Sequence, residues 1–389
     1  MSEWNKITFS NFVEINPKIK LEKSNEYSFV EMADLEAHNK FCEPKKKRML
    51  TGGMRFENGD TLFARITPCL ENGKICQVRN LENGLGFGST EFHVLRGKFG
   101  ISDSNFIFYL SRWNDVKDFA ELNLHGTSGR QRMPHEAFKE LQLLLPPLPE
   151  QQAIAEVLSS LDDKIDLLHR NNKTLEEMAG ALFKSIIKDS SNASNTTVLL
   201  HQIADINPET INSKFRNEHS EIEYLDTGSV TKGQINGFQT LSIDKAPSRA
   251  QRVVRKGDII YSIVRPVQRH YALLDEVKEN TIASTGFAVI RPKVNCHFIY
   301  HLLTSDESVE FLDMIAEAST STYPSLKPSD IGNFEIALPR EEALEQFHQQ
   351  AELLQEKVNK NYRQINELTG LRNILLPKLM SGQVRVKTH

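Results

Sequence analysis

The sequence has few cysteines and no long hydrophobic run. Its four cysteines, scattered over 389 residues, are too few for a disulfide framework. No window approaches the roughly 18 uninterrupted apolar residues that a membrane span requires, and the N-terminal residues lack the basic and then apolar layout of a secretory signal. We therefore expect a cytoplasmic protein that does not associate with a membrane.

The sequence also lacks metal-binding and catalytic motifs. Cys69 and Cys76 have no second Cys or His pair at ligand spacing, which predicts that no zinc is bound. There is no Walker lysine, no Gly-x-Ser-x-Gly and no Asn-Pro-Pro-aromatic of the kind that amino methyltransferases use. The glycine-rich residues 83–90 lead into a strand-like segment instead of a helix, so we expect a flexible loop there and no nucleotide site. The chain is expected to carry no catalytic residue.

Length and charge narrow the class of protein further. A chain of 389 residues exceeds one ordinary hydrophobic core, which points to two domains. The 47 basic and 51 acidic residues give a net charge of −4. This balance excludes histone-like binding of nucleic acid through overall charge, but it leaves room for local basic surfaces.

The chain repeats itself once, with a spacing of about 193 residues. The tripeptide Ile-Asn-Pro at 15–17 recurs at 206–208, Gly-Asp before an apolar strand at 59–60 recurs at 257–258, and the segment 89–96 resembles 284–291. Amphipathic helices are expected near 102–122 and 296–316. Each half then ends in a short strand and a Leu-Pro, at 145–146 and 338–339. The pattern predicts two similar mixed α/β (α+β) domains related by a pseudo-twofold repeat.

Each Leu-Pro precedes a heptad pattern that is typical of a coiled coil. Steps of four and three continue without a break for over thirty residues in each copy, longer than most globular helices. At ~1.5 Å per residue such helices span roughly 50 Å, the length of a spacer. We expect two long helices that pair antiparallel. The expected segments are a first domain at 1–148, a helix at 149–189, a second domain at 190–340, and a helix with a C-terminal tail at 341–389.

Polar residues interrupt these two apolar seams at Asn172, Asn361 and Arg372. Antiparallel alignment of the seams by their midpoints places Asn172 opposite Asn361. Two facing amides can satisfy each other and select one register over heptad slips. The alternative, two asparagines tolerated independently at solvated positions, stays open.

Basic and hydroxyl residues gather in both halves of the chain. Such side chains donate to phosphates, and arginine also recognises purine edges. A charged run is commonly just a solvated surface, but recurrence in two copies favours DNA binding. The candidate DNA-binding residues are Lys45, Lys46, Lys47, Arg48, Arg55, Arg65, Arg130 and Arg132 in the first half, and Arg249, Arg252, Arg255, Arg265, Arg269, His270, Ser321, Tyr323 and Lys327 in the second.

The segment 145–155, LPPLPEQQAIA, with LDDKID at 161–166 behind it, closely resembles the helix of the specificity subunits of type I restriction-modification systems. The layout of two variable domains, each followed by a long helix, is similar over essentially the whole chain. The second copy keeps the Leu-Pro and a Glu-Gln but loses the double proline. The C-terminal LPKLMSG at 376–382 also resembles the end of such subunits.

The resemblance implies a non-catalytic subunit in which each domain recognises one half of a bipartite, asymmetric DNA site. The paired helices would set the spacer and dock two modification subunits, with restriction subunits joining the complex. S-adenosylmethionine, ATP and Mg would then be bound by those partners, and no cofactor by this chain. Two alternatives are a coiled-coil scaffold without sequence-specific DNA binding, and a self-sufficient methyltransferase, which would need motifs that the sequence lacks.

Overall fold

The structure is a computed structural model that describes residues 3–127, 129–191, 196–319 and 323–387. It forms two compact units, which are described separately: unit 1 comprises Met1–Asn171 with Lys360–His389, and unit 2 comprises Asn172–Asn359. These units divide the chain differently from the four segments expected from the sequence, because both boundaries fall inside the long helices. Each unit therefore contains one domain and one end of each helix.

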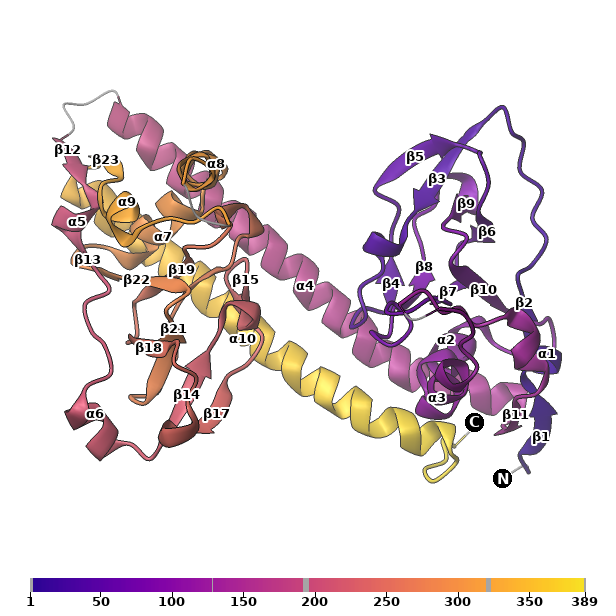
Figure 1. The fold of residues 1–389 in the computed structure, drawn as a ribbon. Helices are drawn as coiled ribbons and strands as arrows, with labels where there is room; N and C mark the ends of the chain where they lie inside the picture. Colours follow the sequence, from indigo (N-terminus) through magenta and orange to yellow (C-terminus); the bar gives the residue numbers. More distant parts are fainter. Residues whose placement is uncertain (1–2, 128, 192–195, 320–322, 388–389) are drawn as a thin grey trace. The chain divides into compact units, whose positions relative to one another are not determined.

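Unit 1 contains three antiparallel or mixed sheets (Figure 1). The first has the order β2 (Val13–Ile15), β10 (Phe92–Gly97), β7 (Thr61–Ala64), β8 (Ile75–Val78), β4 (Phe41–Cys42). The second has the order β5 (Lys46–Met49), β3 (Glu26–Val30), β9 (Leu85–Gly88), β6 (Met54–Glu57). In the third, β1 (Asn5–Thr8) pairs with β11 (Gln142–Leu145). The 3-10 helix η3 (His135–Lys139) precedes β11, and α1 (Phe9–Phe12) follows β1.

Unit 2 repeats these strand orders, except that its first sheet has no counterpart of β4 among the described residues. One sheet is β13 (Ala204–Ile206), β22 (Phe287–Pro292), β19 (Ile259–Ser262), β20 (Tyr271–Leu273), and the next is β17 (Gln239–Ser242), β14 (Glu221–Leu225), β21 (Thr281–Ser284), β18 (Ala250–Val253). Further strand pairs are β12 (Thr196–Leu199) with β23 (Glu335–Leu338), and β15 (Val230–Thr231) with β16 (Gln234–Ile235). Its shorter helices are α5 (Leu200–Ile203), α6 (Ser213–Glu218), η6 (Pro266–Gln268) and α9 (Pro328–Gly332). The internal repeat predicted from the sequence is confirmed.

The repeated Ile-Asn-Pro signal forms the same backbone turn in both units. Asn16 and Asn207 have positive φ angles of 53° and 52°. The side-chain oxygen of Asn16 accepts from the Val94 N–H, and that of Asn207 from the Val289 N–H, each at 2.9 Å. Asparagine tolerates this left-handed conformation better than most residues.

The repeated Gly-Asp signal forms a buried ion pair in both units. Asp60 and Asp258 are each 1% exposed. Asp60 accepts two hydrogen bonds of 2.7 Å from Arg96, and Asp258 accepts two of 2.8 Å from Arg291. Hydrogen bonding to Asp60 and to Asp258, respectively, raises the pKa of Arg96 and Arg291. These pairs stabilise the sheet and are not available to a ligand.

The amphipathic segments near 102–122 and 296–316 each form two helices instead of one. They are α2 (Ser104–Arg112) with α3 (Asn114–Leu122), and α7 (Cys296–Thr304) with α8 (Asp306–Glu317). The breaks occur because Trp113 and Ser305 are extended, with ψ angles of 141° and 151°. The apolar side chains of these four helices pack against the first sheet of their own unit.

The glycine-rich residues 83–90 do not form the expected loop. Leu85–Gly88 is β9, a central strand of the second sheet. A Cβ on Gly88 would lie 2.2 Å from the Val30 carbonyl oxygen, and one on Gly86 would lie 2.9 Å from Phe56. The glycines therefore permit close packing of neighbouring strands.

The long helices are α4 (Leu148–Ser191) and α10 (Glu341–Met380). In unit 1, Ile165 and Leu168 of α4 are buried with Ile365 of α10. In unit 2, Phe183 of α4 lies against Phe347 of α10, with ring centroids 6.1 Å apart. The first half of α4 thus packs against the second half of α10 in unit 1, and the second half of α4 packs against the first half of α10 in unit 2. The predicted antiparallel pairing of the helices is confirmed.

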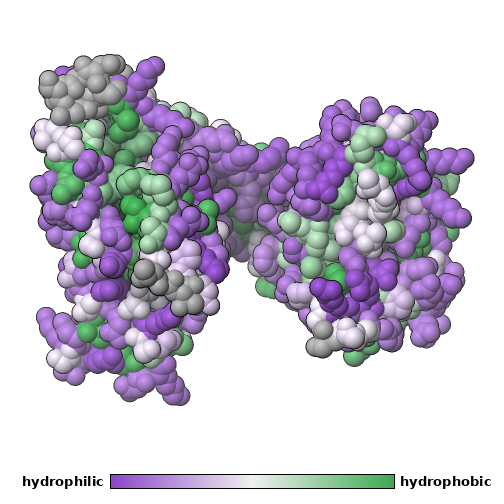
Figure 2. Space-filling view, turned by 45° about the horizontal axis from the view of Figure 1, so that its top comes forward, coloured by the Kyte–Doolittle hydropathy of each residue, from purple (hydrophilic) through white to green (hydrophobic). Residues whose placement is uncertain are grey.

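The face that Figure 2 shows is mainly hydrophilic, with small separate hydrophobic areas. Among the described residues, no helix is both long and apolar enough to cross a bilayer. The apolar side chains concentrate in cores between each first sheet, its two short helices and the adjoining long helices.

Candidate nucleic-acid interface

Three loops meet at one edge of unit 1, where β7 and β9 end. We call them the first rim: residues 65–67, 89–91, 125–127 and 129–133. The Arg65 N–H donates to the Glu91 carbonyl at 3.0 Å, and the Met133 N–H donates to the Arg65 carbonyl at 2.8 Å. The Thr67 N–H donates to the Gln131 carbonyl at 3.0 Å. Segments far apart in the sequence are therefore held as one surface.

Unit 2 builds the same arrangement, the second rim, from residues 263–265, 284–286 and 323–327. The Ile263 N–H donates to the Gly286 carbonyl at 3.0 Å, and the Leu326 N–H donates to the Ile263 carbonyl at 2.8 Å. The Arg265 N–H donates to the Pro324 carbonyl at 3.0 Å. The two rims are equivalent in backbone, although their side chains differ.

The first rim presents two arginines without an acidic partner among the described residues. Arg130 is exposed, and Arg65 is half-buried with its Nε unpaired in the described part of the chain. Arg132 instead forms a bidentate ion pair with Glu91, at 2.7 and 2.9 Å. Hydrogen bonding to Glu91 raises the pKa of Arg132. Arg65 and Arg130 are therefore the cations here that can bind phosphate or base edges.

The second rim carries a different set of side chains. Arg265 is exposed, has a positive φ of 49°, and its guanidinium lies 5.1 Å from the centre of the Tyr323 ring. Lys327 is exposed at the end of the same loop. The backbone carbonyl of Arg249, also exposed, accepts from the Thr285 N–H at 2.8 Å, which brings Arg249 beside the rim. Ser321 lies outside the described residues.

Two further candidates, Arg269 and His270, directly follow the turn η6. Arg269 has a positive φ of 59° and forms an ion pair with Asp306 at 2.5 Å. The His270 ring contacts the Val230 carbonyl. A non-glycine residue at positive φ is strained, and such strain concentrates at functional sites. The Asp306 pair nevertheless leaves Arg269 less available to an anion than Arg265.

The cluster Lys45, Lys46, Lys47 and Arg48 lies on or next to the edge strand β5, away from the first rim's loops. Its cations pair within the chain: Lys45 with Asp34, Lys46 and Arg48 with Glu31, and Lys47 with Glu82. The recurrence of basic residues in the two halves does not place this cluster and Arg249–Arg255 at equivalent positions. The strand order makes β17, which is Gln239–Ser242 and has no basic residue, the counterpart of β5, whereas Arg249–Arg255 surrounds β18.

The remaining candidates lie on β6 and β18 or beside them. The Arg55 guanidinium donates to the Ile19 carbonyl at 2.8 Å. Arg252 has a buried Nε without a partner among the described residues, and Arg255 pairs with Glu209 at 2.8 Å. Sequence reasoning missed the polar rim residues Thr67, Thr90 and Thr285, because only the backbone pairing places them beside the arginines.

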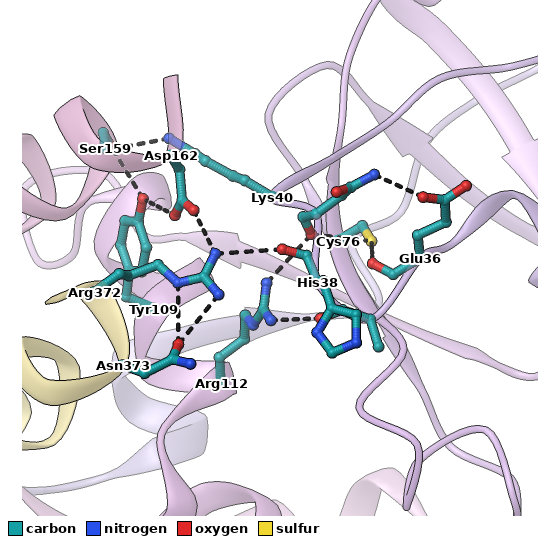
Figure 3. Close-up of polar contacts among 12 residues, drawn as sticks. Glu36, His38, Lys40, Cys76, Tyr109, Arg112, Ser159, Asp162, Arg372 and Asn373 are labelled. Carbon is teal, nitrogen blue, oxygen red and sulfur yellow. Dashed lines mark hydrogen bonds and ion pairs between the residues drawn. The ribbon is translucent and has the colours of Figure 1, made fainter. Parts of the chain in front are cut away.

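A buried polar cluster joins the first domain to both long helices (Figure 3). Asp162 of α4 accepts from the Tyr109 hydroxyl at 2.7 Å and from Arg372 of α10 at 2.6 Å. Asp162 is 2% exposed and Arg372 is 5% exposed. Burial and the Asp162 charge raise the pKa of Tyr109, so its hydroxyl stays protonated. We call this cluster, with Lys40 and Arg112, the first joint.

Two more cations complete the first joint. Lys40 donates to Ser159 of α4 at 2.8 Å, and Arg112 donates to the Asn39 carbonyl at 3.2 Å. Burial, and then the neighbouring Arg372 charge, lower the pKa of Arg112. Among the described residues, Asp162 is the carboxylate that pairs with Arg372, and its negative charge also lies near Lys40 and Arg112. The motif at 161–166 contains this residue, but its spacing alone does not show that it is buried.

A second contact between domain and helix recurs in both units with different chemistry. In unit 1, Arg79 forms a bidentate pair with Asp166 of α4, at 2.9 and 3.0 Å. In unit 2, Asn359 of α10 donates to Asp275 at 2.6 Å. Both contacts connect the end of β8 or β20 to a long helix, so each domain is fastened to the helices at an equivalent place.

The two asparagines of the seams have different surroundings. Asn172 is 2% exposed, and its amide donates to the Val358 carbonyl of α10 at 3.4 Å. Asn361 is half-buried and belongs to the other unit. Their mutual pairing stays a prediction.

Residues 1–177 and 194–368 match the family described as the type I restriction modification DNA specificity domain. The type I restriction enzyme EcoAI specificity subunit of Escherichia coli is 29% identical over 208 residues, which are 52% of this chain and 35% of that protein. The MjaIX specificity subunit of Methanocaldococcus jannaschii is 26% identical over 314 residues, 73% of this chain and 70% of that protein. The match thus spans about a third of the length of the EcoAI subunit.

A solved structure also resembles the chain. The S subunit of a type I restriction-modification system from M. genitalium superposes with a TM-score of 0.57 at 16% identity, covering 97% of this chain and 96% of that one. At this identity the similarity concerns the fold: two mixed α/β domains and two long helices.

Proposed function

The chain belongs to the family of type I restriction modification DNA specificity domains, and from this premise we propose that it is the DNA-specificity subunit of a type I restriction-modification complex. In this role it has no catalytic activity of its own. Each domain recognises one half of a bipartite site on double-stranded DNA through its rim. The paired helices set the spacing between the half-sites and dock the methyltransferase subunits.

The observation that carries this proposal is the pair of equivalent rims. Both use the same backbone hydrogen bonds, yet Glu91 and Arg132 in the first correspond to Gly286 and Ser325 in the second. A shared loop frame with different donors and acceptors suits recognition of two different base sequences. The site is therefore expected to be asymmetric.

The helix pair in unit 2 supports the docking part of the proposal. A groove between α4 and α10 is lined by Met178, Ala181, Leu182, Leu353 and Leu354 among others. Met178 is 49% exposed and Leu353 is 60% exposed. Exposed apolar area on paired helices is typical of a protein–protein contact, and we assign it to a modification subunit.

The proposed partners are double-stranded DNA, two modification subunits, and restriction subunits where the system cleaves as well as methylates. S-adenosylmethionine, ATP and Mg are assigned to those partners and none of them to this chain. The proposed site of action is the cytoplasm.

Methylation mapping tests the proposal. The chain and its modification subunit are expressed in a host without other adenine methyltransferases, and methylated adenines are mapped across the genome. We expect one asymmetric motif made of two short elements with a fixed gap, and none when either protein is omitted. A coiled-coil scaffold without DNA recognition predicts no motif, and that result would refute the proposal.

A further inference from the structure

A cluster of metal-ligating side chains lies in unit 2, away from the second rim. Cys296 and His297 are the first two residues of α7, and His348 is on α10. The sulfur and ring nitrogens of these three residues all lie within 4.8 Å of one another. The cysteine spacing in the sequence could not indicate this group, because its members come from two helices far apart in the chain.

The two histidines have unused ring nitrogens. His297 is 4% exposed, and the Nδ1 atoms of His297 and His348 are buried without a hydrogen-bond partner among the described residues. The rings lie 5.3 Å apart, centroid to centroid. A buried polar atom without a partner costs about 1–3 kcal/mol. Two such atoms on histidines that cluster with a cysteine sulfur are explained if a bound ion supplies the missing partner.

We propose that Cys296, His297 and His348 bind one Zn²⁺ ion, which links α7 of the second domain to α10. One sulfur and two imidazole nitrogens form the donor set that zinc prefers, and three protein ligands leave a fourth position for water. Tetrahedral coordination brings the donor atoms to about 3.5 Å from one another. Small side-chain rotations from the present separations achieve this. Binding displaces the thiol proton to solvent.

The surroundings allow a cation at this place. Cys296 and His348 line a cavity of about 500 Å³ that opens beside them, with Glu345 at its wall. The arginines at the same wall are already paired, Arg255 with Glu209 and Arg291 with Asp258. Solvent therefore has access to the ligands, and the nearest guanidinium charges are neutralised.

The internal repeat contains the same corner without ligands. Helices α2 and α7 begin with equivalent caps, since Asp103 accepts from the Phe106 N–H and Asn295 from the Phe298 N–H, both at 2.9 Å. This equivalence matches Cys296 with Ser104 and His297 with Asn105, and the seam positions match His348 with Ala155. The first domain therefore shows that serine, asparagine and alanine fit this corner.

In unit 2 the ion would link the domain to its long helix, as the buried charged groups of the first joint do in unit 1. The positions of Tyr109, Arg112 and Asp162 in the first joint correspond to His301, Thr304 and Gln355 in the second domain. These three side chains cannot form a buried ion cluster. A metal link between α7 and α10 therefore fastens the second domain to its helix by another means.

The test uses the full chain, purified without chelator and then treated to remove metal. We expect one equivalent of Zn²⁺ to bind, with a rise in the melting temperature of unit 2. Co²⁺ should bind with sulfur-to-cobalt charge-transfer absorption, which reports a thiolate ligand. Cys296→Ser should abolish that absorption, and His348→Ala should weaken Zn²⁺ binding at least tenfold. Cys69→Ser, far from any described histidine cluster, is the matched control and should change neither.

The variant Cys296→Ser, His297→Asn, His348→Ala reproduces the first-domain corner and should fold but bind no equivalent of metal. If the wild-type chain binds no stoichiometric Zn²⁺, or if Cys296→Ser retains the cobalt–sulfur absorption, the proposal is wrong. Loss of metal binding in Cys69→Ser as well would indicate general unfolding or scattered thiol binding and would equally overturn it.

Discussion

Asp162 should contribute more to the stability of unit 1 than either of the residues that it contacts. The perturbation is Asp162→Asn, which keeps the shape and removes the charge. Asp162 is 2% exposed and bonds to Tyr109 and Arg372 at 2.7 and 2.6 Å. Removing one partner of a buried ion pair costs about 3–5 kcal/mol, because the other charge stays buried. Arg372 would lose its carboxylate partner, and Lys40 and Arg112 would lose the favourable charge nearby, so we expect the upper part of that range.

Arg372→Met should cost less than Asp162→Asn. Without Arg372 the carboxylate still accepts from Tyr109 and still lies near Arg112. The double variant Asp162→Leu, Arg372→Met replaces both charges by apolar groups and should recover at least about 2 kcal/mol relative to the sum of the single effects. Arg170→Met is the control, because Arg170 pairs with Asp166 on the surface, where an ion pair contributes about 0–1 kcal/mol.

The chain offers a selective assay for this prediction. Its two tryptophans, Trp4 and Trp113, both belong to unit 1. Urea unfolding followed by tryptophan fluorescence therefore reports unit 1 without a signal from unit 2. If Asp162→Asn costs no more than Arg170→Met, or if the two single effects simply add, the buried charges of the first joint do not stabilise the domain on its helices.

Three further predictions follow from the rims, the buried histidine and the helix seam. Arg130→Ala and Arg265→Ala should each weaken DNA binding by about 1–3 kcal/mol, each for one half-site only. Lys46→Ala and Lys47→Ala should change DNA binding and its salt dependence less, because these lysines already pair with Glu31 and Glu82. Equal effects of all four variants in a filter-binding salt titration would contradict this prediction. Burial lowers the pKa of His93 to about 4, below the usual value of about 6.5. Between these pH values the unfolded chain binds more protons than the folded chain, so unit 1 should lose stability as the pH falls from about 6.5 to 4. His93→Gln should flatten this pH dependence in unfolding experiments that follow tryptophan fluorescence. Asn172→Leu should destabilise the helix pair. The double variant Asn172→Leu, Asn361→Leu should recover stability but accept a wider range of spacings between the half-sites. A double-mutant cycle that shows no coupling between the two positions would refute the pairing of the two amides.

The repeat, the fold class and the antiparallel helices were predictable because each depends on local periodicity. Heptad steps and repeated Ile-Asn-Pro and Gly-Asp signals need only neighbouring residues to be recognised. The rims were not predictable, because Arg65, Glu91 and Met133 meet only through backbone pairing between separate loops. The ion pairs of the Lys45–Arg48 cluster were not predictable for the same reason, because the partners Glu31 and Glu82 are distant in sequence and adjacent only in the sheet.

Some side-chain contacts are identical in the two units, and other side chains differ. In the proposed function, this division explains how such a chain can change its DNA specificity without losing its fold. The buried pairs Asp60–Arg96 and Asp258–Arg291, and the turns at Asn16 and Asn207, are the same in both units. These contacts fix the strand that leads to each rim. The rim side chains are less important for the sheet. Glu91 and Arg132 pair with each other in unit 1, and unit 2 forms the same sheet with Gly286 and Ser325 at the equivalent positions. In the proposed function, substitution on a rim therefore alters the donors and acceptors offered to DNA, while the frame that positions them stays intact.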